Sequence, residues 1–446
     1  MESEGKHCIS MESAKTAVES ICQLVEPPSA TSKFNLNMIY SSNLQASFTL
    51  LKSFIGTGVL ALPYAFKTAG VGLSIVMTAI IGAMLTYCFL LLLETTTETV
   101  GKKKVSFPKL AGKVLGVKGK YLVQALVMVE QLGCCVGILI FTKDFLNHIL
   151  CSFHVEPLCG NTAFNIIFSL SMVVPLSLIN NMHYFYIPSL AANVFIMIGL
   201  LSQMFFNVES VSENPQVKSE FANTLFSAHF TKIPLFFGVA LFSFEGVGLT
   251  FSIRDSMEKP QDLPKILKSQ MMVITSIYII FSAVSCIALG DKLEDIVFFS
   301  LPTNQPIYLL IQILYAVSAL FTYPIQLFPA LRIVEHSEYL GDRLFTDKGK
   351  CKNKPLRYAI RFGVIAVVFL VAYIASSFHL FLDLLGSCVF TSLGFGLPIL
   401  LYMIKFKGKM TLKTKLINYG IAGFIGFFGV LGFAFAFQGL IAGDSK

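Results

Sequence analysis

The chain has 446 residues, of which 54% are hydrophobic and only 13% are charged, and its mean hydropathy is +0.71. A soluble domain is about 25% charged, and no soluble interior could bury this much apolar surface. The composition therefore predicts a multi-span membrane protein. The net charge of +8 does not indicate nucleic-acid binding, because the basic residues fall in short loops between apolar stretches.

Eleven apolar stretches are long enough for membrane-spanning helices, each of which needs about 20 residues. We expect an all-α transmembrane domain at 44–437, preceded by a disordered cytoplasmic tail at 1–43 and followed by a short non-cytoplasmic tail at 438–446. The expected spans are 45–66, 70–93, 121–143, 163–180, 187–207, 233–253, 269–290, 306–330, 356–377, 381–404 and 416–437.

Lysines and arginines indicate the orientation of these spans. About 26 of the 34 lie in the N-terminal segment and in alternate loops, which the positive-inside rule assigns to the cytoplasm. The N-terminus is then cytoplasmic and the C-terminus is not. Cys151 and Cys159 fall in a non-cytoplasmic loop, where oxidation is permitted, so either a disulfide or two free thiols is expected there.

The first expected span contains Gly56-Thr57-Gly58 at mid-depth and Pro63 further on. The glycines lower the cost of leaving helical geometry, and the proline removes a backbone donor. A half-helix starting near Val59 would present free N–H groups, which attract a carboxylate. Tight helix packing through small residues is the alternative interpretation of the same glycines.

The sixth expected span carries Phe244-Glu245-Gly246, followed by Val247-Gly248. A charged carboxylate on a lipid-facing helix costs about 2.5–3.5 kcal/mol. We therefore expect Glu245 to face a polar cavity, to bind a cation or proton, or to be protonated. The two interrupted spans are five apart and run in opposite directions, which predicts a five-plus-five inverted repeat with one additional helix.

Four blocks carry a family resemblance: Lys52 to Phe66, Gln131 to Cys135, Phe244 to Met257 and Leu320 to Ala330. In them the sequence resembles the amino acid/auxin permease family, in its branch of proton-coupled and vacuolar amino acid transporters. The resemblance implies a fold like that of the bacterial leucine transporter, with helices 1 and 6 broken and one extra helix.

The resemblance also implies a substrate site. Gly56, Thr57 and Gly58, with Val59, would receive the carboxylate of an amino acid. Phe244, Glu245 and Gly246 would border its ammonium group and side chain. Both assignments agree with the electrostatics of a half-helix N-terminus and an intramembrane acid.

The candidates for ion coupling are Glu245, Glu130, Ser318 and Thr322. None of the seven histidines lies deep in an expected span, so Glu245 is the leading candidate for proton coupling. Sodium coupling through the hydroxyls of the eighth span remains open. Asp383, near the start of the tenth span, is interpreted as an interfacial acid.

The sequence thus predicts a secondary active carrier of small neutral amino acids that uses alternating access. We expect no cofactor and no metal; H⁺ is the expected coupling ion and Na⁺ the alternative. A sodium-coupled carrier, or an amino acid sensor that signals through the N-terminal tail, is the competing interpretation. The chain lacks a phosphate-binding loop for ATP-driven pumping and the charge ring of a channel.

The expected partners are an amino acid and the lipid bilayer, without nucleic acid, and the sequence leaves the oligomeric state open. An enzyme is not expected, because the spans contain no paired histidines and no ligands at metal-binding spacing. The family branch favours a vacuolar or lysosomal membrane over the plasma membrane.

Overall fold

The computed structural model describes residues 43–101, 103–154, 157–178, 186–213, 229–301, 306–337, 340–344, 352–375 and 377–442. The predicted disordered tail lies outside these residues except for Asn43. The described residues are helical apart from their connections, which agrees with the expected all-α class.

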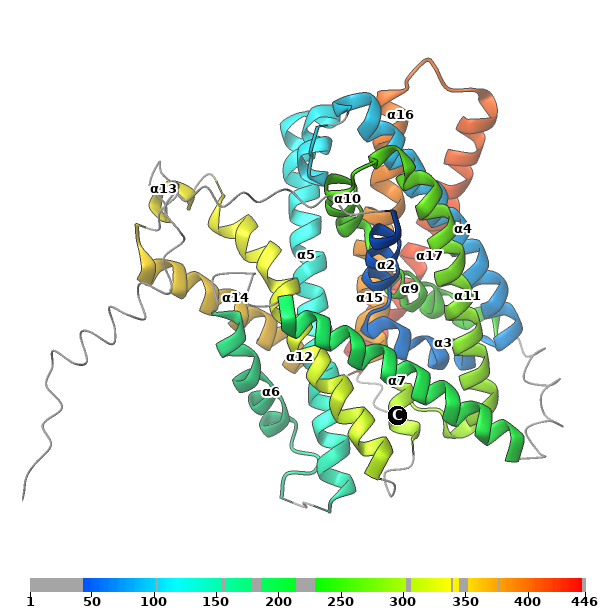
Figure 1. The fold of residues 1–446 in the computed structure, drawn as a ribbon, viewed down its shortest axis with the longest axis vertical. Coiled ribbons are helices and arrows are strands. Elements are labelled where there is room, and N and C mark those ends of the chain that lie inside the picture. Colours follow the sequence, from blue (N-terminus) through cyan, green and yellow to red (C-terminus); the bar gives the residue numbers. More distant parts are fainter. Residues whose placement is uncertain are drawn as a thin grey trace, which may run out of the picture. The chain divides into compact units, whose positions relative to one another are not determined.

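The principal helices are labelled in Figure 1. Their bounds are α2 Asn43–Phe54, α3 Leu62–Ala69, α4 Val71–Val100, α5 Phe107–Ser152, α6 Thr162–Ser177, α7 Tyr186–Glu213, α9 Ile233–Ser243, α10 Val247–Ser256, α11 Leu263–Leu289, α12 Pro306–Glu335, α13 Gly341–Leu344, α14 Lys354–Ile374, α15 Phe378–Leu385, α16 Leu397–Lys405 and α17 Leu412–Ala442. Two π-helical segments, Gly386–Phe390 and Ser392–Gly396, join α15 to α16.

Each expected span overlaps a helical segment of the structure. Among the described residues, eight helical stretches are long and apolar enough to cross a membrane, and the stretches Thr162–Ser177 and Phe230–Ser243 are shorter. Several helices extend beyond the predicted ends: α4 reaches Val100, and α17 continues to Ala442. Because about 20 residues cross the hydrocarbon core, such helices continue into the loops that the sequence predicts.

The outer surface of the helices is apolar, as a bilayer requires. Large hydrophobic side chains such as Phe205, Met272 and Val430 are exposed on α7, α11 and α17. The aromatic residues Phe54, Phe237 and Tyr278 are instead buried between helices. Exposed apolar surface on this scale would be a liability in water and is the expected outer face of a membrane protein.

The first and sixth expected spans are interrupted. The first consists of α2, a 3₁₀ turn at Thr57–Leu60 and α3. The sixth consists of α9 and α10, separated by residues 244–246. These interruptions fall at the glycine-containing motifs singled out in the sequence.

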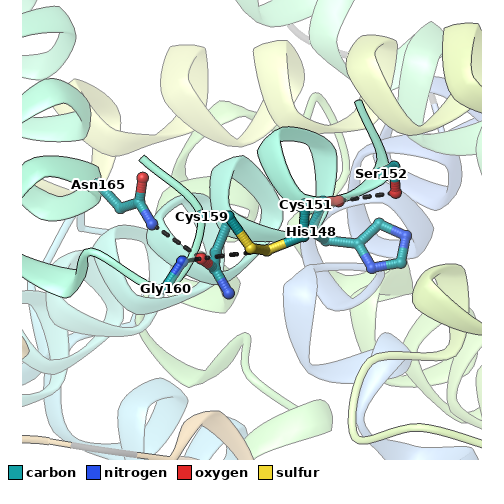
Figure 2. The surroundings of a disulfide bond; sticks show 7 residues. His148, Cys151, Ser152, Cys159, Gly160 and Asn165 are labelled. Carbon is teal, nitrogen blue, oxygen red and sulfur yellow. Dashed lines mark hydrogen bonds between the residues drawn. A yellow bond between two sulfur atoms is a disulfide. The ribbon is translucent and has the colours of Figure 1, made fainter. Parts of the chain in front are cut away.

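The connection between α5 and α6 contains a disulfide between Cys151 and Cys159, drawn in Figure 2. The side-chain oxygen of Asn147 accepts hydrogen bonds from Gly160 N (2.8 Å) and Asn165 Nδ2 (3.1 Å) beside it. The covalent bond and these two hydrogen bonds together tie the end of α5 to the start of α6.

Candidate functional site

The first helix break presents backbone N–H groups. Gly56 is extended (φ −121°, ψ −163°), and Thr57 opens the 3₁₀ turn. The first N–H groups of such a turn have no partner within it, so those of Thr57 and Gly58 are available to a ligand. Pro63 then occupies the first turn of α3, where its missing N–H costs nothing. The break is therefore a positive helix end.

The second helix break presents carbonyl groups and a carboxylate. Here α9 ends at Ser243, and Phe244 and Glu245 close its last turn by donating to Ala240 O (3.3 Å) and Phe242 O (3.1 Å). The end of α9 is the negative end of its helix dipole. Glu245 follows directly, in the non-helical link before α10.

The two breaks are in direct contact. Ser243 Oγ donates to Gly58 O at 3.0 Å. A Cβ on Gly58 would lie 2.9 Å from the Cα of Ser243, a distance that Cβ atoms do not tolerate, so only glycine permits this approach. The sequence predicts both breaks, and the structure brings them together.

Tyr278 of α11 connects the ends of the two half-helices. Its hydroxyl oxygen lies 2.5 Å from Phe54 O and 2.7 Å from Ser243 O, and these are the last residues of α2 and α9. Two negative helix ends thus converge on one hydroxyl donor. The ring of Tyr278 packs against that of Phe244, with 5.0 Å between centroids.

The carboxylate of Glu245 has two side-chain donors. Gln326 Nε2 lies 2.8 Å and Cys134 Sγ 3.1 Å from its Oε1. Glu130 is only 2% exposed and precedes Cys134 by one turn of α5, so it lies on the same face of that helix as the thiol that contacts Glu245. The structure thus gathers both predicted acidic candidates in one region.

A polar stripe on α12 faces the two breaks. Tyr315, Ser318, Thr322 and Gln326 follow one another at intervals of three and four residues, which keeps them on one face of the helix. At one end of the stripe, Tyr315 Oη lies 3.5 Å from Gly56 O; at the other end, Gln326 contacts Glu245. The ion-coupling candidates Ser318 and Thr322 lie between them, and their hydroxyls donate to Tyr315 O and Ser318 O of the same helix.

The predicted substrate-binding residues differ in burial. Gly56, Thr57 and Glu245 are partly exposed, whereas Gly58, Val59, Phe244 and Gly246 are buried. Sequence reasoning missed Tyr278, because a tyrosine in an apolar span carries no motif. Cys134 and Gln326 belong to the blocks that carry the family resemblance, but the sequence did not indicate their contacts with Glu245.

The interpretation of Asp383 as an interfacial acid is wrong. The helix α15 begins at Phe378, so Asp383 lies in its second turn, and its side chain is completely buried. Its position near the start of the tenth expected span suggested exposure, but packing against α9 encloses it.

Free N–H groups, carbonyl ends and a carboxylate at two touching helix breaks can together recognise a molecule with both an anionic and a cationic group. Discontinuous helices with this arrangement are the construction of many secondary transporters, and the two broken helices of this protein share that construction.

The chain belongs to the transmembrane amino acid transporter family, whose family model, described as "Transmembrane amino acid transporter protein", matches residues 40–442. This confirms the resemblance found in the sequence, and it confirms the expectation that the protein is not an enzyme, because the family is one of transporters.

Relatives in fungi and a plant are similar over most of the chain. The "Vacuolar amino acid transporter 3" of Schizosaccharomyces pombe is 32% identical over 354 residues, which is 78% of this chain and 51% of the relative. The "Vacuolar amino acid transporter 4" of Saccharomyces cerevisiae is 29% identical over 86% of this chain and 57% of its own. This chain thus spans about half the length of these fungal relatives. "Amino acid transporter ANT1" of Arabidopsis thaliana is 28% identical over 86% of this chain and 89% of its own.

Solved structures share the fold at low sequence identity. A crystal structure of MhsT in complex with L-phenylalanine matches with a TM-score of 0.52 and 13% identity, covering 89% of this chain and 99% of the other. The inward-facing conformation of Mhp1 matches with a TM-score of 0.56 and 13% identity, covering 90% of each chain. These matches support the expected leucine-transporter-like fold.

Proposed function

We propose that the protein is a secondary active transporter that carries small neutral amino acids together with protons. Contact between the two helix breaks is the observation that carries the proposal. It joins the turn that carries the N–H groups of Thr57 and Gly58 to the end of α9, two residues before Glu245. This arrangement suits the carboxylate and the ammonium group of one amino acid. Neutral substrates are favoured because the N–H groups and Glu245 already match the carboxylate and the ammonium group of the amino acid. Glu130, the other acid of this region, is buried.

Proton coupling is favoured over sodium coupling by the position of Tyr278. Carbonyls at half-helix ends are ligands for a cation in broken-helix transporters. Here the carbonyls of Phe54 and Ser243 already contact the Tyr278 hydroxyl. Glu245, held by Gln326 and Cys134 beside the break, is the group that we assign to proton coupling. Glu130 is the second acid of this region.

We further propose that the chain crosses the membrane eleven times, as two inverted repeats of five helices and one additional helix, α17. The two interrupted segments are five spans apart, and movement of the helices around their contact would alternately open the site to either side. The vacuolar names of the fungal relatives support a vacuolar membrane, and the lysine and arginine distribution supports a cytoplasmic N-terminus.

The test is flux of radiolabelled alanine or proline into proteoliposomes, with and without an imposed proton gradient, comparing the wild type with Glu245→Gln. We expect gradient-stimulated uptake in the wild type and loss of its pH dependence in the variant. Stimulation by a sodium gradient instead would support the sodium-coupled alternative.

Retention of pH-dependent uptake by Glu245→Gln would move proton coupling to another residue. Absence of flux from correctly folded protein would contradict a carrier and favour the sensor. Deleting residues 1–42 separates these two functions, because a carrier keeps its uptake and a sensor loses its output.

A further inference from the structure

Asp383 is a completely buried acid outside the site described above (0% exposed). Its Oδ1 accepts a hydrogen bond from Ser387 Oγ at 3.1 Å and lies against the backbone of Gly238. Its Oδ2 has no hydrogen-bond partner in the described part of the chain. A well-packed carboxylate normally has several donors or a cation, so this environment is built for a neutral, protonated carboxyl group.

The neighbours of Asp383 supply no counter-charge. Oδ1 lies against Gly238 of α9, a helix without any ionisable side chain. Gly432 of α17 packs against Ser387, in a stretch of that helix that is also free of ionisable residues. The helix α5 packs on the other side of α15, where Gly133 and Gly137 meet Leu385 and Leu382. An ionised Asp383 would therefore cost several kcal/mol in this position.

A partly exposed titratable pair lies one helical turn from Asp383. His379 precedes Asp383 by four residues on α15, and residues four apart are neighbours on a helix. The Nδ1 atom of His379 lies 2.8 Å from Asp295 Oδ2, with side-chain exposures of 23% and 42%. The two side chains thus form a partly exposed pair one turn of α15 before the buried acid.

Other titratable groups surround this surface pair. Tyr64 of α3 packs its ring 5.0 Å from that of His379 and lies near Asp295. Asp144 of α5, which pairs with Lys143, and Glu294 both lie near Asp295. This concentration of acids attracts protons to the end of α15 that leads to Asp383.

We propose that Asp383 is a second proton-binding site, which exchanges protons with the medium through His379 and Asp295. The proton is released when α9 and α15 separate and water reaches the carboxyl group. The two π-helical segments that follow α15 support this movement, because such segments are frequent at functional positions in helices. The inference rests on the proposed proton-coupled function and adds a second titrating site to it.

The first test uses wild-type protein and does not depend on transport. Dicyclohexylcarbodiimide adds to protonated carboxyl groups in apolar surroundings, and peptide mass spectrometry locates the adduct. We expect an adduct at Asp383 that decreases as the pH of the reaction is raised. An unmodified Asp383 at every pH, in protein whose Glu130 or Glu245 is modified, would overturn the proposal even where amino acid flux is proton-driven.

The second test compares Asp383→Asn with Ser392→Ala, whose hydroxyl lies on the exposed side of the same region. In proteoliposomes with a trapped pH-sensitive dye, we expect Asp383→Asn to keep amino acid exchange but to move fewer protons per amino acid than the wild type, because Glu245 is still present. His379→Gln, which leaves the buried acid in place, should slow that movement. Wild-type proton movement per amino acid in a folded Asp383→Asn protein would overturn the proposal. The control should behave as the wild type.

Discussion

The first and second helix breaks present opposite chemistry to each other. Between α2 and α3, the polar groups offered by the first break are mainly backbone N–H groups, and its glycines allow the close contact with Ser243. Between α9 and α10, the second break adds the carboxylate of Glu245 to its carbonyl end. Recognition of an anion can therefore rest on backbone geometry, whereas binding and releasing a proton requires a titratable side chain.

If close approach at the first break is essential, Gly58→Ala should have the largest effect. The added Cβ would lie 2.9 Å from the Cα of Ser243 and would force the breaks apart. We expect uptake of labelled amino acid to fall to background while protein remains in the membrane. Gly423→Ala on α17, where the new Cβ meets nothing within 4 Å, is the control; equal uptake by both variants would contradict the packing argument.

Tyr278→Phe tests whether the two breaks depend on one hydroxyl. Leaving a buried carbonyl without a donor costs about 1–3 kcal/mol, so we expect uptake to decrease by about tenfold. The decrease should appear mainly as a raised KM, because the substrate groups are misplaced. Initial rates over a range of substrate concentrations measure it. Tyr419→Phe, at an exposed position on α17, should leave the rates unchanged.

Gln326→Leu tests the hydrogen bond to Glu245 at the second break, and we expect a smaller loss of uptake than for Tyr278→Phe. The variant removes the amide donor 2.8 Å from Glu245 Oε1 but keeps the Cys134 contact. Loss of one hydrogen bond of about 1 kcal/mol predicts a reduction in proton-driven uptake of about fivefold. Gln438→Leu, at an exposed position of α17, is the matched variant, and an equal reduction there would show that the loss is not specific.

The smallest effect on uptake is expected far from either break. Cys151→Ser removes the disulfide that closes a short loop, with a sequence separation of 8. Such a loop stabilises by about 2–3 kcal/mol in the chain-entropy treatment. We expect a lower melting temperature of the detergent-solubilised protein and unchanged uptake. A large loss of uptake at unchanged melting temperature would instead connect this loop to the transport cycle.

Hydropathy and glycine patterns predict the helical segments and both interruptions. A span must be long enough to cross the bilayer, and its backbone N–H and C=O groups must be hydrogen-bonded within the protein. They do not predict which helices meet. The contact of Tyr278 with Phe54 and Ser243 joins residues that are more than 200 and about 35 positions away in the chain, and no local pattern encodes it.

Burial of single polar residues is equally hard to predict. Asp383 lies near the start of the tenth expected span, where an acid usually reaches the interface. Its enclosure depends on Gly238 and Gly432, which lie on two other helices and leave room for the carboxyl group and for Ser387. The environment of Asp383 thus depends on which side of α15 packs against the neighbouring helices.

The close crossing of α9 and α15 has a mechanical consequence. Gly386 lies directly against the backbone of Gly238, so no side chain of either residue interlocks the two helices at this point. Because both residues at the closest point are glycines, the two helices can turn slightly on each other there, whereas sliding would drive the nearby side chains of Asp383 and Ser387 into Gly238. Rotation about this point would therefore be the least costly motion open to the first half of the second broken helix.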